Sequence, residues 1–183
     1  MADGGVKRKA TSPAVPSNSK RALKKERQAS RPNNDVVESS KSVWNELRKK
    51  ENSKERVREL ADELFGIVEG KMGELAKKHD ASRVIQAVVQ FGTEEQRAAT
   101  LKELVDDIPE LSKQQYSHFI VLKMLKYCMK DQACRKMLVK ALKNNVVKLA
   151  THQVGARVVE VYFQEVRRAW ESIEALCWES GVV

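Results

Sequence analysis

A motif that recurs three times along this chain limits its fold more than any other feature. It consists of a small residue, then Arg or His, then two apolar residues, and finally Gln, Val or Glu. The small residues of the three copies are Ser82, Ser117 and Ala156, which lie 35 and 39 residues apart. Repeats of this length are typical of folds in which each unit is a set of helices that buries its apolar face only against its neighbours.

The composition agrees with a helical chain. The 183 residues include only 8 Gly and 4 Pro, and aromatic residues make up 5%. Apolar residues recur every three or four positions after residue 41, as on one face of a helix. We expect breaks near Gly70 and Pro109, a helix over 82–91 with Asp80 as its N-cap, and a new helix beginning at Thr93 after Gly92.

A helix also explains the spacing within the motif. The residues at positions i, i+1 and i+4 project from one surface, and the apolar pair between them points into the stack. Stacked repeats align these polar sets into a row on the concave face of a solenoid. The sequence therefore predicts an all-α repeat domain over residues 41–168.

Residues 1–40 differ from the rest of the chain. They hold nine Lys and Arg against four acidic residues, three of the four prolines and no aromatic residue. Such a segment buries too little apolar surface to offset its ordering entropy, so we expect a disordered basic tail. Two clusters about ten residues apart predict a bipartite nuclear localisation signal that an import receptor binds: Lys7, Arg8, Lys9, then Lys20, Arg21, Lys24 and Lys25.

The first copy of the motif, Ser82-Arg83-x-x-Gln86, resembles the RNA-reading motif of Pumilio-type (PUF) repeats. The resemblance extends over residues 41–163 to a divergent nucleolar branch, the Puf-A-like or pumilio-homologue-3-like proteins. It covers linkers and helix starts as well as the motif: Val43-Trp44-x-Glu46-Leu47-Arg48, His79-Asp80-x-Ser82-Arg83-Val84-Ile85-Gln86, Gly92-x-Glu94-Glu95-Gln96-Arg97, Glu103-Leu104-x-Asp106-Asp107 and Glu110-Leu111-Ser112-Lys113.

This resemblance implies a right-handed solenoid of about three PUF-type repeats that binds RNA. It further implies a nuclear, nucleolar protein in ribosomal RNA processing and large-subunit assembly, or in translation regulation, with pre-ribosomal RNA and proteins as partners. Each PUF repeat reads one base with two or three side chains. The RNA-binding residues it implies here are Ser82, Arg83, Gln86, Ser117, His118, Arg157 and Glu160.

Only the first of the three motifs is complete. Ser82 and Gln86 are able to hydrogen-bond a base edge, and the PUF code makes that base adenine, while Arg83 stacks on it. In the other two motifs Val121 and Ala156 form no side-chain hydrogen bond. The sequence therefore predicts weak sequence preference. The resemblance implies the same for this branch of the family, which binds structured or double-stranded RNA, so we expect phosphate contacts that weaken steeply with salt.

The sequence contains no motif for catalysis or for metal binding. The sequence shows no nucleophile elbow, glycine-rich phosphate loop or metal-ligand spacing, so we expect no enzyme, metal, cofactor or small-molecule substrate. Cys128 and Cys134 are expected to be apolar core thiols. No apolar run approaches the ~20 residues that span a bilayer, so no membrane contact is expected.

Two alternatives remain for the function. A HEAT- or armadillo-like scaffold has helix pairs of similar length and binds peptides or partner helices on its concave face. A basic-tailed assembly factor contacts RNA through residues 1–40 alone. The polar set with Arg or His in each repeat favours RNA binding over the scaffold, and deletion of residues 1–40 distinguishes binding by the repeats from binding by the tail.

Residues 169–183 are apolar for an exposed terminus and resemble no part of the PUF family. We expect either that Trp170 and Trp178 fold back to cap the last helix pair, or that the chain is truncated relative to its longer relatives.

Overall fold

The computed structural model describes residues 22–23 and 33–179, with side chains described as far as Glu171. The chain divides into two units, residues 1–35 and 36–183, and the second unit carries the repeats. The described residues of this second unit form helices and no strands, which confirms the predicted all-α fold.

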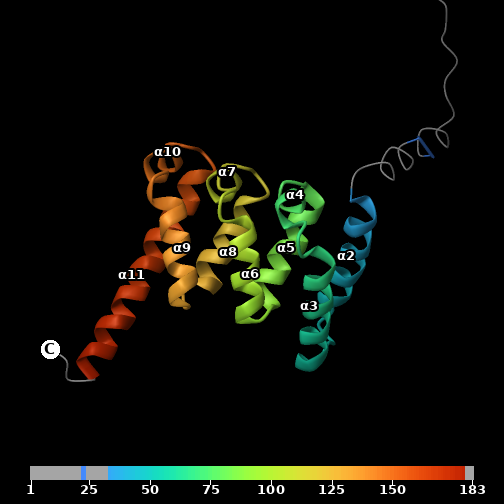
Figure 1. Cartoon of the computed structure of the whole chain (residues 1–183), viewed down its shortest axis with the longest axis horizontal. Coiled ribbons are helices and arrows are strands. Elements are labelled where there is room, and N and C mark those ends of the chain that lie inside the picture. Colours follow the sequence, from blue (N-terminus) through green and yellow to red (C-terminus); the bar gives the residue numbers. More distant parts are fainter. Residues whose placement is uncertain (1–21, 24–32, 180–183) are drawn as a thin grey trace, which may run out of the picture. The chain divides into compact units, whose positions relative to one another are not determined.

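The repeats form three successive helical units within residues 36–183 (Figure 1). Each helical unit begins with one short helix, which is followed by two longer helices in the first two units and by one in the third. The short helices lie along the upper edge of the stack in Figure 1. Two further helices, α2 (Asn34–Leu47) and α3 (Lys54–Val68), precede the three units. The units are α4 (Met72–Ala76), α5 (His79–Phe91) and α6 (Glu94–Leu104); α7 (Ile108–Leu111), α8 (His118–Cys128) and α9 (Gln132–Lys143); and α10 (Val146–Ala150) and α11 (Gly155–Glu179).

The second helix of each unit, which is α5, α8 or α11, belongs to an inner row, because α5 packs on α8 and α8 packs on α11. The predicted apolar pairs of these helices point into the core. Val84, Ile85, Ile120, Val121 and Val158 are fully buried. Close packing of such side chains, rather than helix propensity, provides most of the stability of short helices.

The helix junctions follow the sequence signals with one exception. The backbone N–H of Gly92 donates to Val88 O at the end of α5, and Thr93 forms a capping box with Gln96, as predicted. Asp80, however, is not the N-cap of α5. The helix begins three residues before the predicted start, because Ser82 N–H already donates to Lys78 O at 2.9 Å.

The limits of the repeat domain also differ from the predicted ones. Helix α2 begins at Asn34, within the predicted tail, because Val36 and Val37 are buried against the core. At the other end, α11 runs without a break through residue 169 to Glu179, and Trp170 is 62% exposed. Trp170 therefore does not fold back over the last helix pair.

Several sequence-based predictions concern residues outside the described part of the chain. They are the disorder of residues 1–21 and 24–32, the nuclear localisation clusters between Lys7 and Lys25, and the packing of Trp178. Among the described helices, none has the length and hydropathy needed to cross a membrane.

The turn between α3 and α4 depends on a carboxylate from another helix. Gly70 adopts a positive φ of 73°, which few L side chains tolerate, and reverses the chain there. Glu103 of α6 accepts hydrogen bonds from Gly70 N–H at 3.1 Å and from Met72 N–H at 2.6 Å. This carboxylate takes the place of a side-chain cap at the N-terminus of α4, whose N-cap residue provides none.

We predict that Glu103→Ala lowers the free energy of unfolding by about 2 kcal/mol, because it removes two hydrogen bonds to a charged acceptor. Urea denaturation followed by circular dichroism measures this change. The matched control is Glu63→Ala, which removes an exposed carboxylate of α3 and is expected to stay within about 0.5 kcal/mol. Equal stability of the two variants would contradict the role of Glu103.

Candidate nucleic-acid interface

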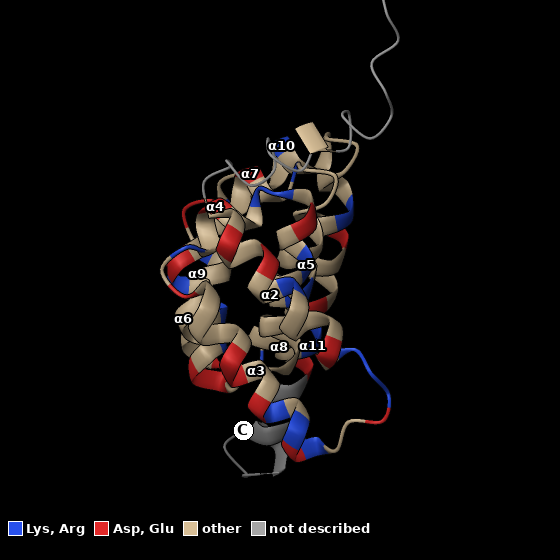
Figure 2. Ribbon diagram, turned by 90° about the vertical axis from the view of Figure 1, so that its right-hand side faces the viewer, with Lys and Arg blue, Asp and Glu red and all other residues tan. Residues whose placement is uncertain are grey.

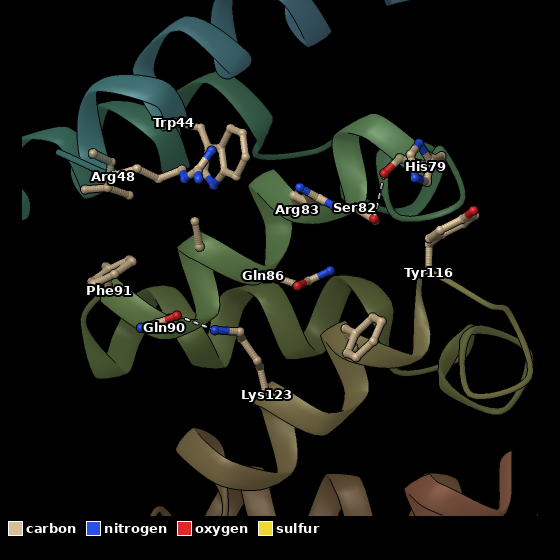
Figure 3. A pocket seen from close by; sticks show the side chains of 13 residues that line it. Trp44, Arg48, His79, Ser82, Arg83, Gln86, Gln90, Phe91, Tyr116 and Lys123 are labelled. Carbon is tan, nitrogen blue, oxygen red and sulfur yellow. Dashed lines mark hydrogen bonds between the residues drawn. The ribbon is translucent and has the colours of Figure 1, made fainter. Parts of the chain in front are cut away.

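A groove lies at the start of the inner row, with walls formed by α2, α5 and α8 (Figure 3). Its volume is about 580 Å³. Helix α5 supplies the floor, because its buried face packs into the core and its opposite face carries charged and amide side chains. The lining residues are Trp44, Leu47, Arg48, His79, Ser82, Arg83, Gln86, Ala87, Gln90, Phe91, Tyr116, Phe119 and Lys123.

The groove collects positive charge without acidic partners. Arg48, Arg83 and Lys123 line it, and no Asp or Glu of the described part of the chain does. Neither Arg48 nor Arg83 forms an ion pair within the described part of the chain. By contrast, the lower end of α6 carries acidic residues (Figure 2), among them Glu94 and Glu95 of its first turn. A cationic wall of this kind attracts phosphates.

Lys123 is the most enclosed of these cations. Its ammonium group donates a hydrogen bond to the side-chain amide of Gln90 on the neighbouring helix (Figure 3). Burial lowers the pKa of Lys123, and the nearby charge of Lys126 lowers it further. Both causes make an added negative charge favourable at this position.

Aromatic rings stand beside these cations. Phe91 and Phe119 are each 40% exposed, and Tyr116 is 44% exposed, which is unusual for large rings of a folded protein. Tyr116 meets the ring of His79 edge to face, with centroids 3.9 Å apart. Flat exposed rings next to cations provide surfaces on which nucleic-acid bases stack.

The structure brings together the three residues predicted in the first repeat. Arg83 is exposed, Gln86 is half-buried, and both line the groove. Ser82 is only 1% exposed, and its hydroxyl donates to His79 O at 3.0 Å, so its oxygen remains only as an acceptor. At this position the groove therefore presents a guanidinium group and an amide, while the serine hydroxyl is almost fully buried.

The two residues predicted in the second repeat lie elsewhere. Ser117 is 2% exposed and donates to Ala76 O at 2.6 Å, which ties α4 to the start of α8. His118 is 6% exposed, with Nδ1 3.0 Å from Gln114 O. Neither residue lines the groove, whereas Phe119 does. The motif of this repeat is therefore shifted by one residue from the predicted alignment.

The buried apolar pairs give the alignment that the structure supports. Val84-Ile85, Ile120-Val121 and Val158-Val159 are equivalent, so the repeats are spaced by 36 and 38 residues. In this register Phe119 is the counterpart of Arg83, and Leu122 is the counterpart of Gln86. The leucines at 75, 111 and 149 are also spaced by 36 and 38 residues and carry the same signal.

The third repeat places its polar residues on α11, outside the groove. Arg157 and Glu160 are exposed, and Ala156 beside them is exposed as well. Glu160 accepts from Gln164 at 3.4 Å, and Arg157 has no ion pair among the described residues. Arg157 occupies the position of Arg83 and Phe119 in its repeat, so these three residues stand before the buried pairs of successive inner helices.

The two cysteines whose side chains the structure describes take no part in the groove. Cys128 and Cys134 are both buried. Burial raises the pKa of Cys128 to about 12 and that of Cys134 to about 11, so both thiols are protonated at neutral pH. Among the described residues, no group of three His, Cys, Asp or Glu is placed to hold a metal ion.

The sequence matches the Pumilio-family RNA binding repeat at residues 72–105, 107–141 and 145–160, which correspond to the three helical units. The three repeats are of the Pumilio family. It is 38% identical over 147 residues to Pumilio homolog 3 of Rattus norvegicus and of Homo sapiens. These matches cover 80% of the chain but only 22% of each relative.

Solved structures show the same likeness. A crystal structure of human Puf-A in complex with DNA superposes with a TM-score of 0.66 at 37% identity. The superposition covers 71% of this chain and 25% of that one. Both comparisons confirm the predicted family, its PUF-type repeats and the helical-repeat fold.

We predict that Phe119→Ala weakens RNA binding, whereas Ser117→Ala affects only the stability of the fold. Ser117→Ala removes a buried hydrogen bond and is expected to lower the free energy of unfolding by about 1 kcal/mol, with no change in affinity for RNA. Phe119→Ala removes a half-exposed stacking surface and is expected to weaken RNA binding about tenfold, while the loss of its buried part lowers the free energy of unfolding by about 1 kcal/mol. Thermal melts and fluorescence anisotropy with a labelled RNA measure the two quantities. The reverse pattern would support the alignment that pairs Ser117 with Ser82.

Proposed function

We propose that this chain binds RNA along the inner row of helices, mainly through phosphate contacts and base stacking. The observation that carries this proposal is a groove lined by three cations and by no acidic residue among those that the structure describes, beside exposed rings and amides. Cations attract the phosphates, rings stack on bases, and amides such as Gln86 pair with base edges. The DNA bound to human Puf-A, a relative of similar fold, supports a nucleic-acid ligand.

The groove favours weak sequence preference. Discrimination between bases requires hydrogen-bonding side chains at both reading positions of a repeat. Ser82 and Gln86 satisfy this in the first repeat, but Leu122 is apolar in the second and Ala156 has no polar side chain in the third. One base of three is then read by hydrogen bonds, and the others are held by stacking and charge.

The biological setting is proposed from the relatives and from the tail. Similarity to Pumilio homolog 3 proteins supports a role in nucleolar ribosomal RNA processing and large-subunit assembly, with pre-ribosomal RNA and proteins as partners. Translation regulation is the alternative outcome for an RNA-binding chain of this family. The basic clusters between residues 7 and 25 favour import into the nucleus by an import receptor.

A second observation favours the protein-scaffold alternative. A groove of about 540 Å³ between α9 and α11 has an apolar floor that includes Val139, Tyr162, Val166 and Trp170. Lysines and an arginine of α9 form its rim. Apolar grooves with a charged rim bind helices of partner proteins, so this end of the repeat stack suits a protein ligand.

The salt dependence of RNA affinity distinguishes RNA binding in the groove from the protein-scaffold alternative. We predict that Arg83→Ala with Lys123→Ala flattens the slope of log affinity against log salt by about 0.7 for each phosphate that the variant no longer binds. Filter binding of a labelled single-stranded RNA at several salt concentrations measures the slope. The matched control is Lys130→Ala with Lys136→Ala, which removes two lysines outside this groove and is expected to leave the slope unchanged.

The same assay separates the repeats from the tail. Deletion of residues 1–33 leaves α2 and the groove intact, so salt-sensitive binding is expected to persist. Loss of all RNA retention on this deletion would assign binding to the tail. Absence of salt-sensitive retention by the whole chain would leave the scaffold as the function.

We predict that alanine replacement of the seven basic residues of the two tail clusters shifts a fluorescent fusion of the chain from the nucleus to the cytoplasm. Import receptors bind such clusters through acidic grooves, and alanine removes the charge. The control replaces Lys136, Lys140 and Lys143 of α9 in the same fusion. A fusion that stays nuclear without the clusters would contradict the localisation signal.

A further inference from the structure

Two residues of the groove come from outside the three repeats. Trp44 and Arg48 line it from α2 and the residue that follows this helix, before the first matched repeat begins at residue 72. The Arg48 guanidinium carbon lies 4.6 Å from the centroid of the indole ring. Figure 3 shows this pair reaching toward the groove from the α2 side.

The position of Trp44 is fixed by contacts of α2 with the first repeat. Nearly one helical turn before it, Lys41 donates to the carboxylate of Asp80 on α5 at 3.2 Å. This contact lowers the pKa of the Asp80 carboxyl, chiefly through the hydrogen bond from Lys41. Nearly one turn after Trp44, Leu47 is buried in the core. The indole is therefore held beside the groove by contacts on both sides of it along the helix.

Both side chains retain unused binding capacity. The indole N–H has no acceptor among the described residues, and no described buried side-chain nitrogen or oxygen lacks a partner, so this N–H is open to solvent. Arg48 is exposed and forms no ion pair in the described part of the chain. An aromatic ring, an N–H donor and a guanidinium together match a nucleotide, which offers a planar base and a phosphate.

We propose that Trp44 and Arg48 form an additional nucleotide subsite, which extends the RNA path by one base beyond the repeats. The base stacks on the indole, and Arg48 moves from the ring to the adjacent phosphate. This inference rests on RNA binding in the groove and assigns to α2 a role that the repeat motif does not contain. Stacking on an indole face is tolerant of base identity, so the subsite adds affinity without adding sequence preference.

Tryptophan fluorescence tests the subsite directly. The chain has three tryptophans, so Trp170→Phe with Trp178→Phe leaves Trp44 as the only one. Oligouridylates of increasing length are titrated into this variant, while anisotropy of a labelled end reports binding. We expect short oligonucleotides to bind without changing the emission, and quenching to begin at the length that reaches past Arg83 to α2.

Affinity provides the second measurement. Trp44→Leu and Arg48→Gln are each expected to weaken binding of the long oligonucleotide about tenfold and to leave the short one unchanged. Trp170→Leu, in the other groove, is the matched control. Because the quenching experiment retains Trp44, it remains decisive if Trp44→Leu does not fold.

The outcomes separate this proposal from the proposed function. Tight binding of the long oligonucleotide with no quenching of Trp44 and no loss of affinity in Arg48→Gln would overturn the subsite while RNA binding by the repeats stands. Failure of every oligonucleotide to bind the unaltered chain would overturn both.

Discussion

Burial of one apolar pair in each inner helix determines the rest of this structure. Successive helical residues are turned by about 100°, so two neighbouring residues that point into the core force the residue before them outward. Val84-Ile85, Ile120-Val121 and Val158-Val159 are these pairs. The residues that precede them are Arg83, Phe119 and Arg157, and all three are exposed. The packing of the core thereby sets which side chains meet a ligand.

Hydrogen bonds between helices hold the inner row in place. Arg97 of α6 donates to the carbonyls of Val89 and Gln90 near the end of α5, at 2.9 and 3.3 Å, and its guanidinium lies 5.6 Å from the ring of Tyr127. This one side chain connects the end of α5 to the following repeat. It thereby supports Gln90, which positions Lys123 in the groove. The groove is thus built on backbone positions that are restrained before any ligand arrives, which lowers the entropy cost of binding.

The sequence was sufficient to predict the helices and the first repeat of the site, and insufficient for the rest. Periodicity and capping signals predicted the helical class, the break at Gly70 and the junction at Gly92-Thr93, because these depend on local chemistry. The start of α2 was missed because Val36 and Val37 gain their stability from distant core residues. In the second repeat, matching the serines led to a register one residue away, since Ser117 serves the backbone of Ala76 rather than the groove. The contributions of Trp44 and Lys123 depend on contacts between separate helices, which no local pattern contains.

The cations of the groove have a consequence for the folded chain itself. Arg48, Arg83 and Lys123 are brought onto one surface, where no described acidic residue lines the groove, and the chain as a whole carries a net charge of +9. Such like charges repel one another in the compact state, and dissolved ions screen this repulsion. Salt therefore acts on this protein in two opposite directions. It strengthens the unliganded fold, and it weakens the hold of that fold on a polyanion.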